Sequence, residues 1–401
     1  MKLDRVPGMS KVANWVLIIL VAAFVSTLSG CGSVQKIDKK RFSDTELLRF
    51  ARKVLNDEEF ALFRVPNKIS DQLHQIAKQV ARPGWSKQYQ AKQLAFKLLA
   101  SDELGITYTH NCNYSAQEVF ENRKANCISY TNLFVGMARS IGINAEYAEV
   151  TEVESYSKVG DTVVYNSHVC AVVFKGPNHY LIDFSLRPHK NYHFWRALSD
   201  LEAAAVFYNN IGAQKYLEED HPDRIKEALT YFYMARKLAP TLPQVYNNLG
   251  VIELNQNNIL EAEKYFRTAL ERRPGYFAAY SNLGSLYLTR GELDNALTLY
   301  KVAVESSPEN KYAFHALARL QIRKGYNKEA ERSLRKALAL DQRFTEARHE
   351  LGRLFLRSGR LTDALDQFAL ALKFQPDDKI AQSKIDMIES LAVDRRDTPQ
   401  R

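Results

Sequence analysis

The sequence is poor in cysteine, glycine and proline, which number 4, 17 and 12 among its 401 residues. So few cysteines cannot build the dense disulfide framework of a small secreted scaffold, and each must be interpreted singly. The low glycine content excludes a collagen-like chain. No strong surplus of charge is present either: 55 Lys and Arg face 46 Asp and Glu, and this mild net +9 does not indicate nucleic-acid binding. With 46% hydrophobic residues, the chain is globular rather than disordered and long enough for two or three domains.

The first thirty residues combine a positive start with an apolar stretch. Lys2, Arg5 and Lys11 precede the nearly uniformly apolar residues 15–28, and small residues then lead to Cys31. This order is typical of a secretory signal. A cysteine in that place resembles the lipobox of bacterial lipoproteins, in which the signal is cut before the cysteine and the cysteine receives lipid. A transmembrane anchor is the alternative, although the stretch is short for a span of about 20 residues.

This resemblance implies a location in the bacterial cell envelope. Residues 1–30 are expected to be the signal peptide and 31–41 a tether, with acyl chains on Cys31 holding the protein to a membrane. Gly32 follows the cysteine, where an aspartate would resemble an inner-membrane retention signal. We therefore expect a lipid-anchored protein of the outer membrane that faces the periplasm.

The C-terminal half repeats with a period of 34 residues. The recurring positions are Leu249-Gly250, Leu283-Gly284, Leu317-Ala318 and Leu351-Gly352, together with Ala262, Ala296, Ala330 and Ala364. Small residues at fixed positions allow two helices to approach closely, and prolines in the same phase end the second helix of each unit. The pattern resembles the tetratricopeptide repeat, which has two antiparallel helices per unit.

The repeat array extends in both directions from these four units. Residues 208–212 reproduce residues 246–250 at an offset of 38, so an earlier unit carries four extra residues. The sequence therefore predicts five units over 205–378, preceded by a linker over 191–204. Residues 379–393 are expected to form an amphipathic helix that caps the exposed end of the array, with a tail over 394–401.

A basic stripe recurs on the first helix of two neighbouring units. Its members are His315, Arg319, Arg323, His349, Arg353 and Arg357. Residues spaced by four lie on one helix face, and the two stripes occupy equivalent positions one repeat apart. A solvated cationic face is the simpler interpretation. The functional one is a groove that binds an anionic protein or peptide segment, since Arg recognises carboxylates with two parallel hydrogen bonds.

The middle of the chain mixes helical and strand patterns. Apolar spacing predicts helices over 46–55, 70–80 and 89–99, and a further helix that begins near Cys127 and ends at Gly142. Alternating residues predict strands over 145–153, 163–174 and 180–183. Cys127 would then lie at a helix N-terminus, where backbone N–H groups favour a thiolate.

Several motifs in this region resemble the core of transglutaminase-like proteins. They are residues 115–119, 126–134 and 139–143, followed by Ser167-His168-Val169 on one strand and by Asp183 on the next. The resemblance covers about 85–190 and implies an α+β, papain-like domain over 42–190, followed by an all-α repeat solenoid. It implies Cys127 as nucleophile, His168 as its base and Asp183 as the residue that orients the histidine. A thiol needs such a base, and an imidazole needs such a carboxylate.

The motifs depart from the family in two mild ways. Ala125 stands where glycine is usual, and Phe184 stands where proline is common. No side chain can be assigned as an oxyanion donor. Any pairing among Cys112, Cys127 and Cys170 remains open. No cofactor or metal is expected, because trustworthy ligand spacing and a glycine-rich phosphate loop are both missing from the sequence.

Two functions from different classes fit these patterns. The first is a cysteine peptidase, amidase or acyltransferase that works through a thioester at Cys127, with the repeats recruiting a protein partner. The second is a non-catalytic envelope scaffold that binds peptides and proteins. The substrate, the acyl acceptor, the partner and the oligomeric state are not specified by the sequence.

Overall fold

The computed structural model describes residues 41–394 except 101–103, 111, 160–161, 176–177, 185–194, 219–220 and 307. The expected signal peptide and lipid-bearing Cys31 lie outside these residues, as do most of the tether and the tail. The chain forms two compact units, one running to Leu249 without residues 158–163 and the other comprising those six and residues 250–401. Within the described part, no helix is both long and apolar enough to cross a bilayer.

Four helices at the start of the described chain begin at polar side-chain caps. They are α2 (Asp44–Val54), α3 (Asp57–Leu62), α4 (Asp71–Val80) and α5 (Lys87–Leu99). Their caps are Ser43, Asn56, Ser70 and Ser86, each accepting a hydrogen bond from a backbone N–H of the first turn. These side chains satisfy groups that a helix start otherwise leaves without a partner, which explains why the helices begin where they do.

The helix α8 (Cys127–Ser140) is the centre of the first unit. It is preceded by β1 (Thr107–Tyr108), α7 (Ala116–Asn122) and β2 (Lys124–Ala125), and β1 pairs with β2 in parallel. Most of α8 is buried. At Gly136 an added Cβ would lie 2.3 Å from the backbone oxygen of Asn67, so glycine permits the close approach of that segment.

A four-stranded sheet accompanies this helix, with the strand order β5-β4-β3-β6. Its strands are β3 (Ala145–Val159), β4 (Thr162–Lys175), β5 (Asn178–Ile182) and β6 (Trp195–Leu198). Strand β6 pairs antiparallel with β3, so the prediction of a linker over 191–204 is wrong for this stretch. Strand β6 has only four residues, which is too few to show the alternation of apolar and polar residues that predicts a strand. The strand with which it pairs, β3, lies about 50 residues earlier in the sequence.

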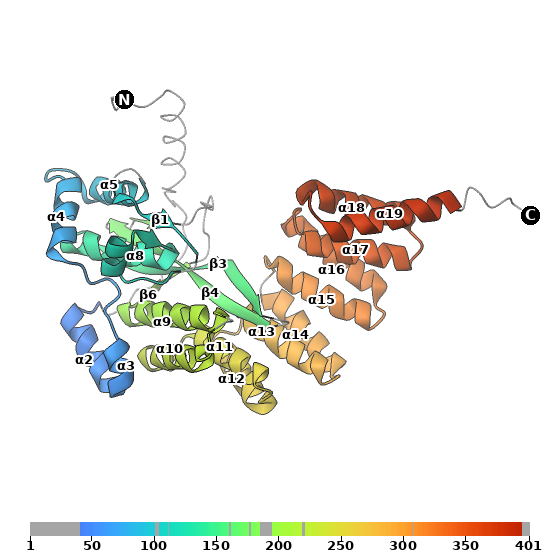
Figure 1. The fold of residues 1–401 in the computed structure, drawn as a ribbon, viewed down its shortest axis with the longest axis horizontal. Helices are drawn as coiled ribbons and strands as arrows, with labels where there is room; N and C mark the ends of the chain where they lie inside the picture. The colour runs from blue at the N-terminus through green and yellow to red at the C-terminus, as the bar shows by residue number, and fades with distance from the viewer. Residues whose placement is uncertain are drawn as a thin grey trace, which may run out of the picture. The chain divides into compact units, whose positions relative to one another are not determined.

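The repeats form antiparallel helix pairs whose members follow the 34-residue phase. The helices are α9 (Asp200–Leu217), α10 (Arg224–Leu238), α11 (Pro243–Asn255), α12 (Ile259–Arg272), α13 (Phe277–Thr289), α14 (Leu293–Ser306), α15 (Lys311–Arg323), α16 (Asn327–Leu340), α17 (Thr345–Arg357), α18 (Leu361–Phe374) and α19 (Lys379–Asp394). Figure 1 shows α13 to α18 as successive hairpins, with α19 following α18 at the end of the array.

Close packing explains the small residue that recurs in each first helix. A Cβ added at Gly250 would lie 2.6 Å from the Phe266 ring, and one added at Gly284 would lie equally close to Tyr300. Where the first helix instead carries Ala318, the matching position of the second helix is Leu334, and both are buried in one cluster. When alanine replaces glycine on the first helix, the ring on the second helix is therefore replaced by the smaller side chain of leucine.

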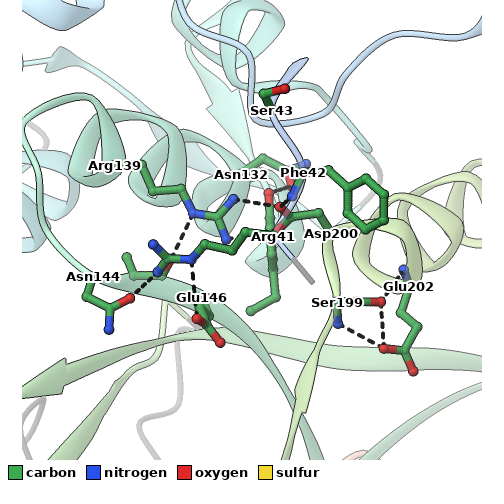
Figure 2. Close-up of polar contacts among 12 residues, drawn as sticks. Arg41, Phe42, Ser43, Asn132, Arg139, Asn144, Glu146, Ser199, Asp200 and Glu202 are labelled. Atoms are coloured by element: carbon green, nitrogen blue, oxygen red, sulfur yellow. Dashed lines mark hydrogen bonds and ion pairs between the residues drawn. The ribbon is translucent and has the colours of Figure 1, made fainter. Parts of the chain in front are cut away.

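The pair α9 and α10 belongs to the first unit rather than to the rest of the array. Asp200, the first residue of α9, accepts hydrogen bonds from both terminal nitrogens of Arg139 in α8, at 3.0 and 2.9 Å. Asp200 also accepts the backbone N–H of Phe42 at 2.9 Å. Figure 2 shows how this carboxylate joins the start of the described chain, α8 and α9. The first repeat is thus part of the same compact unit as the domain before it.

Candidate active site

Cys127 is the first residue of α8, as the sequence predicts, and its side chain is partly exposed. The preceding residue, Asn126, is the N-cap, and its Oδ1 accepts the backbone N–H of Ser129 at 3.0 Å. The Nδ2 of the same Asn126 amide donates a hydrogen bond to Asn113 Oδ1 at 2.9 Å, which holds the N-cap side chain in place. The N–H groups of the first turn favour negative charge at the Cys127 sulfur.

A threonine connects this helix end to the strand that carries the histidine. The Thr131 hydroxyl lies 2.8 Å from the carbonyl oxygen of Cys127 and 3.3 Å from that of Val169. The residue before Val169 is His168, in β4. One buried hydroxyl therefore brings the cysteine backbone and the histidine strand to within reach of each other.

His168 and Asp183 form the rest of the predicted constellation. The register of β4 and β5 pairs Ala171 with Ile182, so Asp183 follows the end of β5 close to His168. The distance from His168 Nε2 to Asp183 Oδ1 is 3.1 Å, and both side chains are buried. On its other side, His168 is hydrogen bonded to the Cys127 side chain. The structure thus brings together the three residues that the sequence predicted.

The protonation of His168 follows from these neighbours. Burial lowers the pKa of the imidazole, but hydrogen bonds to Asp183 and Cys127, together with their negative charge, outweigh it and raise the pKa to about 10. A protonated histidine hydrogen bonded to a cysteine is the partner that thiol nucleophiles use in catalysis. The carboxylate also fixes which ring nitrogen faces the sulfur.

Tyr108 is a residue of this site that the sequence analysis did not identify. Burial raises the pKa of the Tyr108 hydroxyl, and the neighbouring Cys127 and Asp183 side chains add to this shift. The Tyr108 ring stacks on Tyr130, with centroids 6.3 Å apart, and Tyr130 stacks on Phe184 at 5.5 Å. The aromatic residue that replaces the usual proline at 184 therefore supports the floor of the site. No periodic pattern marks Tyr108, since its role depends on the pairing of two very short strands.

The remaining cysteines of the described chain are buried and unpaired. Cys112, Cys127 and Cys170 are all free thiols in this structure, so none of the three conceivable disulfides is formed. Burial raises the pKa of the Cys112 thiol to about 11 and raises that of Cys170 well above its ordinary value. Both thiols are thus protonated at neutral pH. Among the described residues, no group of three or more His, Cys, Asp or Glu side chains is placed to hold a metal ion.

The predicted basic groove lies on α15 and α17, which contact each other in the second unit. Arg319, Arg323 and Arg357 are exposed, and Arg353 is partly exposed and lies 3.2 Å from Glu350. The four arginines therefore form the accessible part of the stripe.

The two histidines of the stripe have structural surroundings. His349 is buried, and its Nε2 lies 2.6 Å from Asp378 Oδ2 at the start of α19. This corrects the expectation of a groove histidine at that position, because the partner carboxylate comes from the capping segment 29 residues later. His315 is partly buried and packs edge-on against Phe344, with ring centroids 5.1 Å apart.

Comparison with protein families agrees with this architecture. The model of the transglutaminase-like superfamily matches residues 74–196. The tetratricopeptide-repeat model matches residues 247–311 and 315–379. The chain thus has a transglutaminase-like domain followed by a helical tetratricopeptide-repeat region. No curated protein matches the chain.

Solved structures resemble somewhat less than half of the chain in each case. A thermophilic repeat protein of Thermus thermophilus is 27% identical over 46% of this chain and 99% of its own, with a TM-score of 0.38. YrrB, described as a repeat protein with an unusual peptide-binding site, is 20% identical. The match covers 45% of this chain and 90% of YrrB, with a TM-score of 0.34. Pseudomonas aeruginosa pilF is 16% identical. The match covers 49% of this chain and 87% of pilF, with a TM-score of 0.42. At such TM-scores these likenesses carry no argument about function.

Proposed function

We propose that this chain, in which a transglutaminase-like domain precedes tetratricopeptide repeats, is a cysteine hydrolase or acyltransferase that acts on a peptide or amide. The observation that supports this most is the hydrogen-bonded series Cys127, His168 and Asp183, assembled from α8, β4 and the end of β5. A helix end, a strand and its neighbour supply the nucleophile, the base and the orienting carboxylate that thiol catalysis needs.

The chemistry runs through a thioester. His168 holds the proton of Cys127, and the thiolate sulfur attacks the substrate carbonyl carbon, forming a C–S bond while an electron pair moves to the carbonyl oxygen. When that pair returns, the C–N bond breaks and His168 gives its proton to the leaving nitrogen. Water or a second amine then attacks the thioester, His168 accepts its proton, and the C–S bond breaks. Hydrolysis and transfer differ only in this last nucleophile.

The repeats would recruit a protein or peptide partner to this domain. Arg319, Arg323, Arg353 and Arg357 present guanidinium groups at equivalent positions of two neighbouring helices. Guanidinium binds carboxylates through paired hydrogen bonds, so the partner segment in this proposal is anionic. Lipid on Cys31 would hold the protein to the outer membrane, facing the periplasm, which would bring both modules to envelope proteins.

Alkylation of the three described cysteines tests the catalytic proposal. At neutral pH, iodoacetamide should modify Cys127 at least about tenfold faster than Cys112 and Cys170, which serve as buried internal controls. His168→Ala should remove most of this advantage, and Asp183→Asn should remove less, because the base remains. If Cys127 reacts as slowly as the two buried thiols, the domain is a binding module and the chain a non-catalytic scaffold.

A further inference from the structure

Helix α9 of the first repeat is connected by hydrogen bonds to both ends of the helix that carries the candidate nucleophile. At the far end of α8, Arg139 pairs with Asp200 at the start of α9. At the near end the connection runs through Asn113, in the segment before α7. Its Nδ2 donates to the backbone oxygen of Asn210 at 3.2 Å and to Gln214 Oε1 at 3.0 Å. Helix α9 thus offers two acceptors to one side of the Asn113 amide.

The opposite side of the Asn113 amide faces the N-cap of α8. Asn113 Oδ1 accepts a hydrogen bond from Asn126 Nδ2 at 2.9 Å, and Asn126 Oδ1 accepts the backbone N–H of Ser129 at 3.0 Å. Asn126 is buried and directly precedes Cys127. An amide has donors on one side and an acceptor on the other, so each asparagine of this series fixes the orientation of the next. The acceptors on α9 therefore determine which way the N-cap amide points.

The orientation of the N-cap amide affects the thiol that follows it. If the amide were reversed, Asn126 Nδ2 would face the Ser129 N–H, and the cap would be lost because two donors cannot pair. The first turn of α8 would then loosen, and its N–H groups would no longer be fixed beside the sulfur. Since those N–H groups favour negative charge on Cys127, the reactive thiolate would become less favourable.

We propose that Asn113 is a positioning residue, through which α9 of the first repeat holds the N-cap of α8 and thereby sets the reactivity of Cys127. This inference rests on the proposed thioester function, since it takes Cys127 as the nucleophile. The first repeat would then support the nucleophile in addition to any part in recruiting a partner.

Substitutions at Asn113 and Gln214 can remove this connection without opening the core. The main chain beside Asn113 is held separately, because the Tyr114 N–H donates to Ser129 Oγ at 2.8 Å. Gln214 is partly exposed and, like Asn113, borders a cavity of about 190 Å³, so a shorter side chain only enlarges existing space. We therefore expect Asn113→Ala and Gln214→Ala to melt within about 4 °C of the wild type.

The rate at which iodoacetamide alkylates Cys127, followed as a function of pH, measures the effect. Asn113→Ala should slow alkylation at pH 7 about fivefold, as expected for the loss of one hydrogen bond, and should move the midpoint of the pH–rate profile upward. Gln214→Ala should slow it less, because the Asn210 carbonyl still accepts from Asn113. Gln214→Glu should stay within about twofold of the wild-type rate, since its carboxylate accepts the same hydrogen bond.

A double-mutant cycle separates positioning from a general structural effect. Asn126→Ser keeps an N-cap acceptor, and a hydroxyl can turn to the Ser129 N–H without help from Asn113. In the Asn126→Ser background, Asn113→Ala should therefore change the alkylation rate by less than about twofold. Asn122→Ala is the matched control in the wild-type background, because Asn122 Nδ2 donates to the Glu118 carbonyl of its own helix. It should leave the rate within about twofold.

The outcomes distinguish this inference from the proposal on which it rests. Fast alkylation of wild-type Cys127 that is unchanged in Asn113→Ala overturns the role of Asn113 and leaves the thioester function standing. An equal loss in the wild-type and Asn126→Ser backgrounds also overturns it, because Asn113 would then not act through the N-cap. A wild-type protein whose Cys127 reacts as slowly as the buried Cys112 and Cys170 contradicts both.

Discussion

The buried ion pair of Arg139 and Asp200 provides a quantitative test of how the first repeat joins the preceding domain. Asp200 has a side chain only 3% exposed, and its Arg139 partner is 17% exposed. Its carboxylate satisfies both terminal nitrogens of the guanidinium and the backbone N–H of Phe42 (Figure 2). Asp200→Asn preserves the shape of this side chain but removes its charge and puts a donor where an acceptor is needed.

The expected loss of folding stability follows from the Arg139 charge, which the substitution leaves without its partner. Breaking one partner of a buried pair leaves an uncompensated charge, which costs about 3–5 kcal/mol, and the partial exposure of Arg139 favours the lower end, about 3 kcal/mol. For a unit of this size, that corresponds to a fall in melting temperature of about 6–12 °C. Asp57→Asn is the matched control: Asp57 lies 3.0 Å from Arg52 with a side chain 91% exposed, so its cost should stay below about 1 kcal/mol.

Calorimetry gives the stability of each variant, and hydrogen–deuterium exchange read by mass spectrometry locates the change. Exchange in Asp200→Asn should accelerate in peptides of both α8 and α9, since the pair joins these helices. Replacing both partners, with Arg139→Met added, should recover part of the loss because no charge is left buried. Equal shifts for Asp200→Asn and Asp57→Asn would refute the reasoning, since the carboxylate would then not hold the two helices together.

Other consequences can be checked with single variants. Because the pKa of His168 is raised to about 10, its contribution to stability should be complete below about pH 6.5 and lost as pH rises to 10; denaturation across this window should show a steeper loss for wild type than for His168→Gln. Gly136→Ala should destabilise the fold in thermal melts despite the better helix propensity of alanine, since its Cβ would lie 2.3 Å from the Asn67 oxygen. Arg319→Ala with Arg353→Ala should weaken partner binding and its salt dependence well beyond an Arg332→Ala and Lys373→Ala pair on the second helices, as titrations at two salt concentrations would reveal. Cys31→Ser should leave an unlipidated precursor, and a normally acylated mature protein in that variant would remove the membrane-tether hypothesis.

The parts of the fold with a repeated or local signal were predictable from the sequence. The 34-residue period comes from small residues that must pack against a ring one helix away, as Gly250 does against Phe266, and such steric demands leave a visible pattern. The candidate catalytic residues could be predicted because Cys127, His168 and Asp183 stand in motifs that resemble a known family. Their meeting in space then follows from a helix start and from the register of two adjacent strands.

The parts set by contacts between distant residues were not predictable. Tyr108 lies 19 residues before Cys127 and reaches it only through the two-residue pairing of β1 with β2. Asp378 holds the His349 side chain away from the groove, and no helical periodicity in the sequence connects these two residues. Asp200 looks like an ordinary residue at a helix start, although it is the carboxylate that joins α9 to α8. In each case the deciding interaction is one tertiary contact of a polar side chain, which leaves no pattern along the chain.

The central claim is that Cys127 carries an acyl group during turnover, and mapping the acylated peptide tests it most directly. After brief exposure of the intact protein to p-nitrophenyl acetate, digestion and mass spectrometry should find the acetyl group on the peptide that contains Cys127. Neutral hydroxylamine should remove it, as expected for a thioester, and Cys127→Ala should show no such adduct. Acetylation confined to lysines, or an adduct of equal yield on Cys112 or Cys170, would contradict the assignment of Cys127 as the nucleophile.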